Sequence, residues 1–134
     1  MRILLDTNAY SAMVEGHENV CALVRMSERV IFSTVVIGEL LAGFRGGSRF
    51  ERNRRILDEY LGSPYVLEVA VTRTSADRFG RIWAGLRAKR HPIPTNDVWI
   101  AAHAMETGAD LVSFDDHFEA IDGLAWVHLK STGP

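Results

Sequence analysis

The chain has 134 residues, of which 47 % are hydrophobic, so it can bury one sizeable core and is not a disordered chain. Its net charge of −2 excludes a general attraction to nucleic acid or to an anionic membrane, and its single cysteine excludes an internal disulfide framework. Residues 1–5 are too few for a signal sequence, and the longest apolar run, 35–43, is interrupted by Glu39. We therefore expect a soluble, cytoplasmic protein with no membrane partner.

Short apolar runs alternate along the chain with stretches of helical periodicity. The apolar runs predict five strands, at residues 3–5, 30–32, 65–69, 111–114 and 126–128. The periodic stretches predict helices at residues 9–14, 20–26, 35–42, 50–61, 74–89, 97–107 and 117–121. No repeat or domain boundary interrupts the alternation, so we expect residues 1–134 to form a single α/β domain with a mostly parallel sheet and a frayed tail at 131–134.

The ends of several predicted helices carry residues typical of caps. Asn19, Ser33 and the pair Thr95-Asn96 are predicted N-caps, and Gly108 suits the position just after a helix. Three tryptophans lie in apolar patterns and are expected in the core: Trp83, Trp99 and Trp126.

Four acidic residues stand at places where a side chain can face a ligand. Asp6 and Asp115 each follow a predicted strand, and Asp97 begins a helix. Taken singly, these three can be ordinary turn or capping residues. Glu39 is harder to explain, because an unpaired carboxylate is costly inside an otherwise apolar helix, although an arginine partner would satisfy it.

Taken together, the four acids predict one site. In an open parallel sheet the ligand site lies beyond the carboxyl ends of the strands, where these residues should meet. Crowded carboxylates repel one another unless a cation neutralises them, and oxygen ligands suit Mg²⁺ or Mn²⁺. Zinc is not supported, because Cys21 is alone and the five histidines are scattered. We expect a magnesium or manganese site that takes a phosphate group.

Several motifs, in this order, resemble the PIN domain family, and within it the VapC toxins of bacterial VapBC toxin–antitoxin pairs. The matching stretches are 4–8 (LLDTN), 33–43 with Glu39 inside it, 94–97 (PTND) running into 100–104 (IAAHA), and 108–118 (GADLVSFDDHF). The resemblance covers nearly the whole chain. It implies a three-layer α/β/α domain with about five mostly parallel strands and a Mg²⁺-dependent ribonuclease activity that leaves a 3′-hydroxyl.

The resemblance also assigns roles to residues. The family's acidic quartet falls on Asp6, Glu39, Asp97 and Asp115; the first and third are expected to ligate the ion, the other two to hold its waters or a second ion. The family's polar residues around the metal fall at four positions: Thr7, Asn8, Asn96 and Ser113. Asp116 stands where a basic residue is common in relatives, which leaves open whether Asp115 or Asp116 reaches the metal. The resemblance further implies a homodimer, a VapB-like antitoxin that blocks the acids with a basic side chain, and contact with DNA only through that antitoxin.

RNA bound beside acids needs positive residues nearby. Two basic clusters can supply them, and the candidates are Arg45, Arg49, Arg52, Arg87 and Arg90. Solvated helix faces and an arginine-rich composition explain the same pattern, so both readings stay open. His117 can contact substrate, but none of the five histidines is expected to be catalytic.

Two other functions remain open from the residues. The first is a Mg²⁺-dependent phosphatase or phosphotransferase with Asp6 as nucleophile, which the Asn8 two residues later disfavours because such sites commonly carry a second acid there. The second is a non-catalytic module whose acidic cleft binds a basic partner.

Overall fold

The structure is a computed structural model and describes residues 1–130, so the expected tail at 131–134 lies outside the described residues. Five strands form one sheet in the order β3-β2-β1-β4-β5, and every neighbouring pair is parallel. The strands are β1 (Arg2–Leu5), β2 (Arg29–Ser33), β3 (Val66–Val69), β4 (Asp110–Ser113) and β5 (Trp126–His128). The prediction of five strands in a parallel sheet is confirmed.

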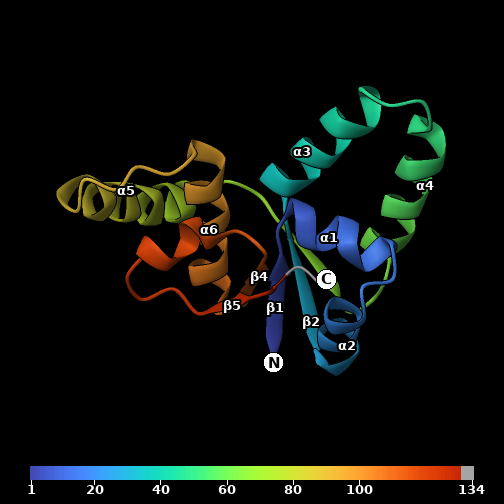
Figure 1. Cartoon of the computed structure of the whole chain (residues 1–134), viewed down its shortest axis with the longest axis horizontal. Coiled ribbons are helices and arrows are strands. Elements are labelled where there is room, and N and C mark those ends of the chain that lie inside the picture. The colour runs from blue at the N-terminus through green and yellow to red at the C-terminus, as the bar shows by residue number, and fades with distance from the viewer. Residues whose placement is uncertain (131–134) are drawn as a thin grey trace.

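Helices cover both faces of the sheet, which gives three layers (Figure 1). The first face carries α1 (Thr7–Val14), α2 (Glu18–Met26), α3 (Thr34–Arg45) and α4 (Phe50–Leu61). The second face carries α5 (Arg73–Ala88), α6 (Thr95–Thr107) and the short 3-10 helix η1 (Asp116–Ala120). Right-handed crossovers explain this division, because the chain moves outward from β1 to β3 and then returns across the sheet to β4.

The central strands are apolar because they are covered on both sides. Ile3, Leu4 and Leu5 of β1 are fully buried, as are Leu111 and Val112 of β4. Leu5 of β1 pairs with Val112 of β4, so the two strands end side by side. The chain order reverses between these two strands, and that is the switch point at which open α/β sheets place their ligands.

The predicted caps are confirmed at two helix ends and wrong at two others. Ser33 caps α3 by accepting a hydrogen bond from the Val35 backbone N–H at 3.1 Å, and Gly108 follows α6 with a left-handed φ of 67°. Asn19 does not cap α2, because His17 precedes the helix and its Nδ1 accepts from the Val20 N–H.

The predicted Thr95-Asn96 cap is wrong as well. Pro94 is the N-cap of α6, and its carbonyl oxygen accepts hydrogen bonds from the Asp97 and Val98 N–H groups. The side chains of Thr95 and Asn96 therefore do not cap the helix. Asp97 lies in the first turn, as predicted.

One of the three tryptophans departs from its prediction. Trp99 and Trp126 are half-buried, whereas Trp83 is 40 % exposed. Helix α5 lies outside α6 (Figure 1), so only its side with Ile82 and Leu86 is buried, and Trp83 stands at the margin of that side, stacked on Phe79.

Among the described residues, no helix has the length and apolarity that a membrane crossing requires.

Candidate metal centre

Asp6 is the most buried of the four predicted acids, with 7 % of its surface exposed. It follows β1 directly and caps α1, since one carboxylate oxygen accepts from the Ala9 N–H at 2.8 Å. The other oxygen accepts from the Ser113 hydroxyl at 2.5 Å, across the switch point at the end of β4. The backbone N–H of Asp115 in turn donates to the Ser113 Oγ at 2.9 Å. Ser113 therefore links the acids that follow the two strands.

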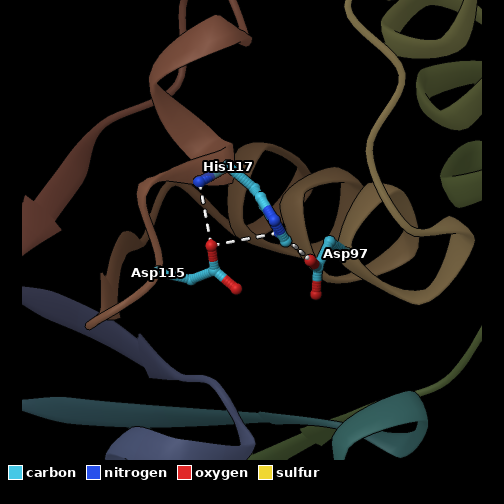
Figure 2. A group of neighbouring side chains, drawn as sticks. All are labelled: Asp97, Asp115 and His117. Atoms are coloured by element: carbon cyan, nitrogen blue, oxygen red, sulfur yellow. Dashed lines mark hydrogen bonds and ion pairs between the residues drawn. The ribbon is translucent and has the colours of Figure 1, made fainter.

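Asp97, Asp115 and His117 converge from α6, the end of β4 and η1 (Figure 2). The Nδ1 of His117 lies 3.0 Å from Asp97 Oδ2 and 3.0 Å from Asp115 Oδ1, so the imidazole stands between the two carboxylates. The His117 backbone N–H also donates to Asp115 Oδ1 at 2.9 Å. One candidate ligand atom from each of the three residues lies within 4.8 Å of the other two.

Glu39 reaches the same region from α3 and is held by two predicted supporting residues. The Thr7 hydroxyl donates to Glu39 Oε1 at 2.6 Å, and the Asn96 amide donates to Oε2 at 3.3 Å. These bonds explain how a carboxylate is tolerated in an apolar helix without an arginine partner. They also connect the starts of α1 and α6 through one side chain.

The pKa values of two of these acids are raised, in part by the charges of their neighbours. Burial is the main reason that the pKa of Asp6 rises to about 6, and the charges of Asp97 and Asp115 raise it further against the hydrogen bonds that lower it. The pKa of Asp97 is raised chiefly by burial, and the charges of Asp115 and Glu39 act in the same direction. The pKa of His117 is raised, first of all by its hydrogen bond with Asp97. Negative charge is thus concentrated at the switch point.

Among residues 1–130, these acids have few basic groups close to them. Apart from His117, no basic group in this part of the chain lies within ion-pair distance of Asp6, Glu39, Asp97 or Asp115. Crowded carboxylates with convergent oxygens and unmatched charge are a donor set that fits a hard divalent cation such as Mg²⁺ or Mn²⁺. An imidazole nitrogen is also compatible with Mn²⁺, since imidazole is a common ligand of divalent metals.

The remaining predicted residues lie around this centre or away from it. Asn8 and Asp116 are exposed, and no hydrogen bond of either side chain occurs among the described residues. Asp115, rather than Asp116, joins the compact group with Asp97. The five candidate RNA-binding arginines are all exposed: Arg45, Arg49, Arg52, Arg87 and Arg90. Of these, the Arg45 guanidinium lies 3.9 Å from the centre of the Phe50 ring.

Sequence reasoning did not place His117 in the centre. Its position depends on η1, which brings the residue two places after Asp115 back over Asp97. The signal that could have found it is the spacing itself, because a short helix beginning directly after Asp115 turns the side chain at the second following position toward the strand end.

The fold and this centre define an open-sheet α/β domain with a carboxylate-rich ligand edge. Residues 3–124 match the PIN domain, and the chain therefore belongs to the PIN domain family.

Individual proteins named as ribonucleases are similar to this chain over most of its length. The chain is 26 % identical over 132 residues to a protein named Ribonuclease VapC1 from Haemophilus influenzae, covering 94 % of this chain and 96 % of the relative. It is 28 % identical over 130 residues to Ribonuclease VapC5 from Mycobacterium tuberculosis, covering 94 % and 92 %.

Solved structures have the same fold. A VapBC2 structure from Rickettsia felis, bound to a promoter DNA fragment, superposes with a TM-score of 0.85 at 23 % identity and covers 97 % of this chain and 100 % of its own. VapBC-1 from nontypeable Haemophilus influenzae gives 0.83 at 24 % identity, with 96 % and 98 % covered. These likenesses confirm the expected PIN-like three-layer fold.

Proposed function

We propose that this chain is a metal-dependent endoribonuclease and the toxin of a toxin–antitoxin pair. The observation that carries the proposal is the convergence of Asp6, Glu39, Asp97 and Asp115 at the switch point without an arginine or lysine partner in residues 1–130. The names of the relatives, Ribonuclease VapC1 and VapC5, support RNA as the substrate.

Each residue of the centre has a role in this proposal. Asp6 and Asp97 hold the cation, while Glu39 and Asp115 hold waters or a second ion. A divalent cation bound there supplies an activated water and neutralises charge on the phosphodiester. Ser113 fixes the rotamer of Asp6, and Thr7 and Asn96 orient Glu39, so little reorganisation is required when the phosphate arrives.

The proposed partners follow from the same relatives. The solved neighbours include a member of the VapBC family of toxin–antitoxin systems, and VapBC2 is bound to promoter DNA. We expect a small VapB-like antitoxin to bind this chain and place a basic side chain against the acids, a homodimer of the toxin, and contact with DNA only through the antitoxin.

The test is cleavage of single-stranded RNA by purified protein with Mg²⁺, with Mn²⁺ and with excess EDTA. Wild type should produce fragments with 3′-hydroxyl ends, EDTA should stop the reaction, and added Mg²⁺ or Mn²⁺ should restore it. Asp97→Asn should stay folded and inactive, while an exposed acid far from the centre, changed in Asp77→Asn, serves as the control. Cleavage that persists in EDTA, or in Asp97→Asn, would refute the metal mechanism.

A further inference from the structure

A cavity of 260 Å³ lies beside the end of α5, outside the metal centre. The cavity is lined by aromatic and apolar side chains together with basic ones, and no carboxylate lines it. The floor and walls include Trp83, Pro92, Ile93, Arg87, Arg90 and His91. Aromatic rings flanked by guanidinium groups suit an unpaired nucleotide, whose base stacks on the ring while its phosphate meets the arginines.

The floor of this cavity is fixed in place by a stack of three rings. The ring of Trp83 stacks on Phe79 with centroids 5.7 Å apart and an interplanar angle of 16°, and Phe79 stacks on Trp99 at 4.1 Å and 30°. Trp99 belongs to α6, two residues after Asp97, so the stack joins the cavity to the helix that carries an acid of the centre. Trp83 nevertheless leaves 40 % of its surface exposed, which makes it a rigid platform with a free face.

The end of α5 holds an arginine in a backbone conformation that favours glycine. Arg90 has a φ of 56°, the only positive φ of a non-glycine residue in the described part of the chain. Its N–H donates to the Arg87 carbonyl oxygen, and the His91 N–H donates to the Leu86 carbonyl oxygen, which together form a Schellman cap.

The same cap ends α6, where the corresponding residue is Gly108. The Gly108 N–H donates to the Met105 carbonyl oxygen and the Ala109 N–H to the Ala104 carbonyl oxygen. Because glycine serves this geometry without steric strain, Arg90 keeps a strained conformation that α6 avoids. Strain of this kind persists where a side chain has a function, and the exposed guanidinium of Arg90 has no stabilising ion pair among residues 1–130.

A second cavity borders the first one and reaches His117 of the metal centre. It measures 370 Å³, and its lining carries both signs of charge: Lys89, His91, Asp116, His117, Glu119 and Ala120. His91 therefore borders both cavities, and His117 stands between the second cavity and the carboxylates of Asp97 and Asp115. The two cavities are therefore adjacent through His91, and the second adjoins the centre through His117.

We propose that the cavity over Trp83 is a nucleotide subsite of the RNA substrate, in which one unpaired base flanking the cleaved bond stacks on the Trp83 ring and the adjoining phosphate is bound by Arg90. This inference rests on the proposed ribonuclease function and extends it to a binding site outside the acids. The subsite fits any base, since every base has a stacking face, and it selects single-stranded over double-stranded RNA.

The test measures binding rather than cleavage. The inactive Asp97→Asn protein is titrated in EDTA against a fluorescein-labelled single-stranded RNA of mixed sequence, and anisotropy gives the dissociation constant. Adding Trp83→Ala should weaken binding by about 5- to 150-fold, the effect of losing one stacked base, and Trp83→Phe should restore most of it. Adding Arg90→Gly should weaken binding and reduce the slope of log affinity against log salt by about 0.7, the contribution of one phosphate of a single strand.

Two controls separate these effects from misfolding. Arg90→Gly should not lower the melting temperature, because glycine relieves the strained φ. Arg25→Gln removes an exposed guanidinium from the end of α2, far along the chain from the cavity, and should leave both affinity and salt slope unchanged.

The possible failures are distinguishable. Unchanged RNA affinity in both Trp83→Ala and Arg90→Gly, with wild type still cleaving RNA, would refute the subsite and leave the function intact. A change in oligomeric state on Trp83→Ala with unchanged RNA affinity would identify the cavity as a protein contact and also refute it. Failure of the wild type to bind or cleave RNA at all would refute the function and the subsite together.

Discussion

Two polar clusters lie at the same edge of the sheet. One is a neutral serine–histidine pair, and the other is a group of carboxylates. At the end of β2, Ser33 and His103 are fully buried, with Oγ and Nδ1 2.7 Å apart. Ser33 also caps α3, so this pair is bound into the fold from two elements. At the ends of β1 and β4, by contrast, Asp6 and Asp115 belong to a group of acids whose charges help to raise the pKa values of Asp6 and Asp97.

The direction of the pKa shifts makes the difference explicit. Burial lowers the pKa of His103, which keeps its ring neutral at pH 7 and compatible with an apolar surrounding. Burial raises the pKa of Asp6 to about 6, so carrying a negative charge at pH 7 costs the folded chain free energy. The first cluster is therefore uncharged at pH 7, whereas the second gathers carboxylates whose charge a bound cation would neutralise. Four substitutions test this contrast.

The largest expected effect comes from Asp115→Asn. Loss of its charge should reduce metal-dependent RNA cleavage by about 10²–10³-fold, the range found when one electrostatic contact to a transition state is removed. Single-turnover cleavage rates at saturating Mg²⁺ measure it. A loss smaller than that of Asp116→Asn would show that the neighbouring acid is the one that matters.

The next effect is on stability and depends on pH. The folded protein holds a proton on Asp6 between pH 3.8 and about 6, where the unfolded chain has lost it, so the free energy of unfolding falls as pH rises through this window. The fall attributable to Asp6 is about 3 kcal/mol, at 1.4 kcal/mol for each pKa unit.

Urea unfolding in EDTA, compared between wild type and Asp6→Asn across this pH range, isolates that contribution. His103 acts in the opposite direction, since its lowered pKa makes stability rise with pH up to about 6.5, but it is present in both proteins and cancels in the difference. Asp6→Asn should be relatively more stable above pH 6 than below pH 4. Parallel pH profiles for the two proteins would contradict the assignment.

A smaller loss is expected for Ser33→Ala, in the cluster that serves the fold. It removes the cap of α3, worth about 1 kcal/mol, and leaves a buried histidine nitrogen without its partner at about 1–3 kcal/mol. Urea unfolding should show a loss of about 2 kcal/mol or more, and EDTA-sensitive cleavage should remain at temperatures where the variant is folded. Ser48→Ala, in the exposed loop before α4, is the control and should change neither.

The smallest expected effect belongs to Asp116→Asn. Its side chain is exposed and stands outside the compact group, so both stability and cleavage should change by no more than about 0.5 kcal/mol, or roughly twofold. The same cleavage assay as for Asp115→Asn measures it. A loss comparable to that of Asp115→Asn would place Asp116 in the centre.

Much of this arrangement could be predicted from the sequence, because it depends on local patterns. Apolar runs such as Ile3–Leu5 predicted the strands, and the parallel sheet then brought Asp6 and Asp115 to one edge. The strand order is not local, and neither is the return of His117 over Asp97, which depends on the short helix η1 packing beside α6. The sequence therefore did not predict residues such as His117, whose place in the site depends on how distant elements pack together.

The exposed face of Trp83 illustrates the same limit. Its spacing with Phe79 and Ile82 is that of a buried helical face, and the periodicity alone cannot show that α5 is an outer helix with only one covered side. The strained φ of Arg90 was equally hidden, because no sequence pattern marks an arginine in a position that suits glycine.

Calorimetric titration of Mn²⁺ into the purified, EDTA-treated and desalted protein tests the central claim most directly. Wild type should bind Mn²⁺ with an affinity that weakens sharply in Asp6→Asn and in Asp97→Asn, while Ser33→Ala should bind it like wild type. Equal Mn²⁺ binding by wild type and both aspartate variants, or none by the wild type, would contradict the account of these acids as a metal centre.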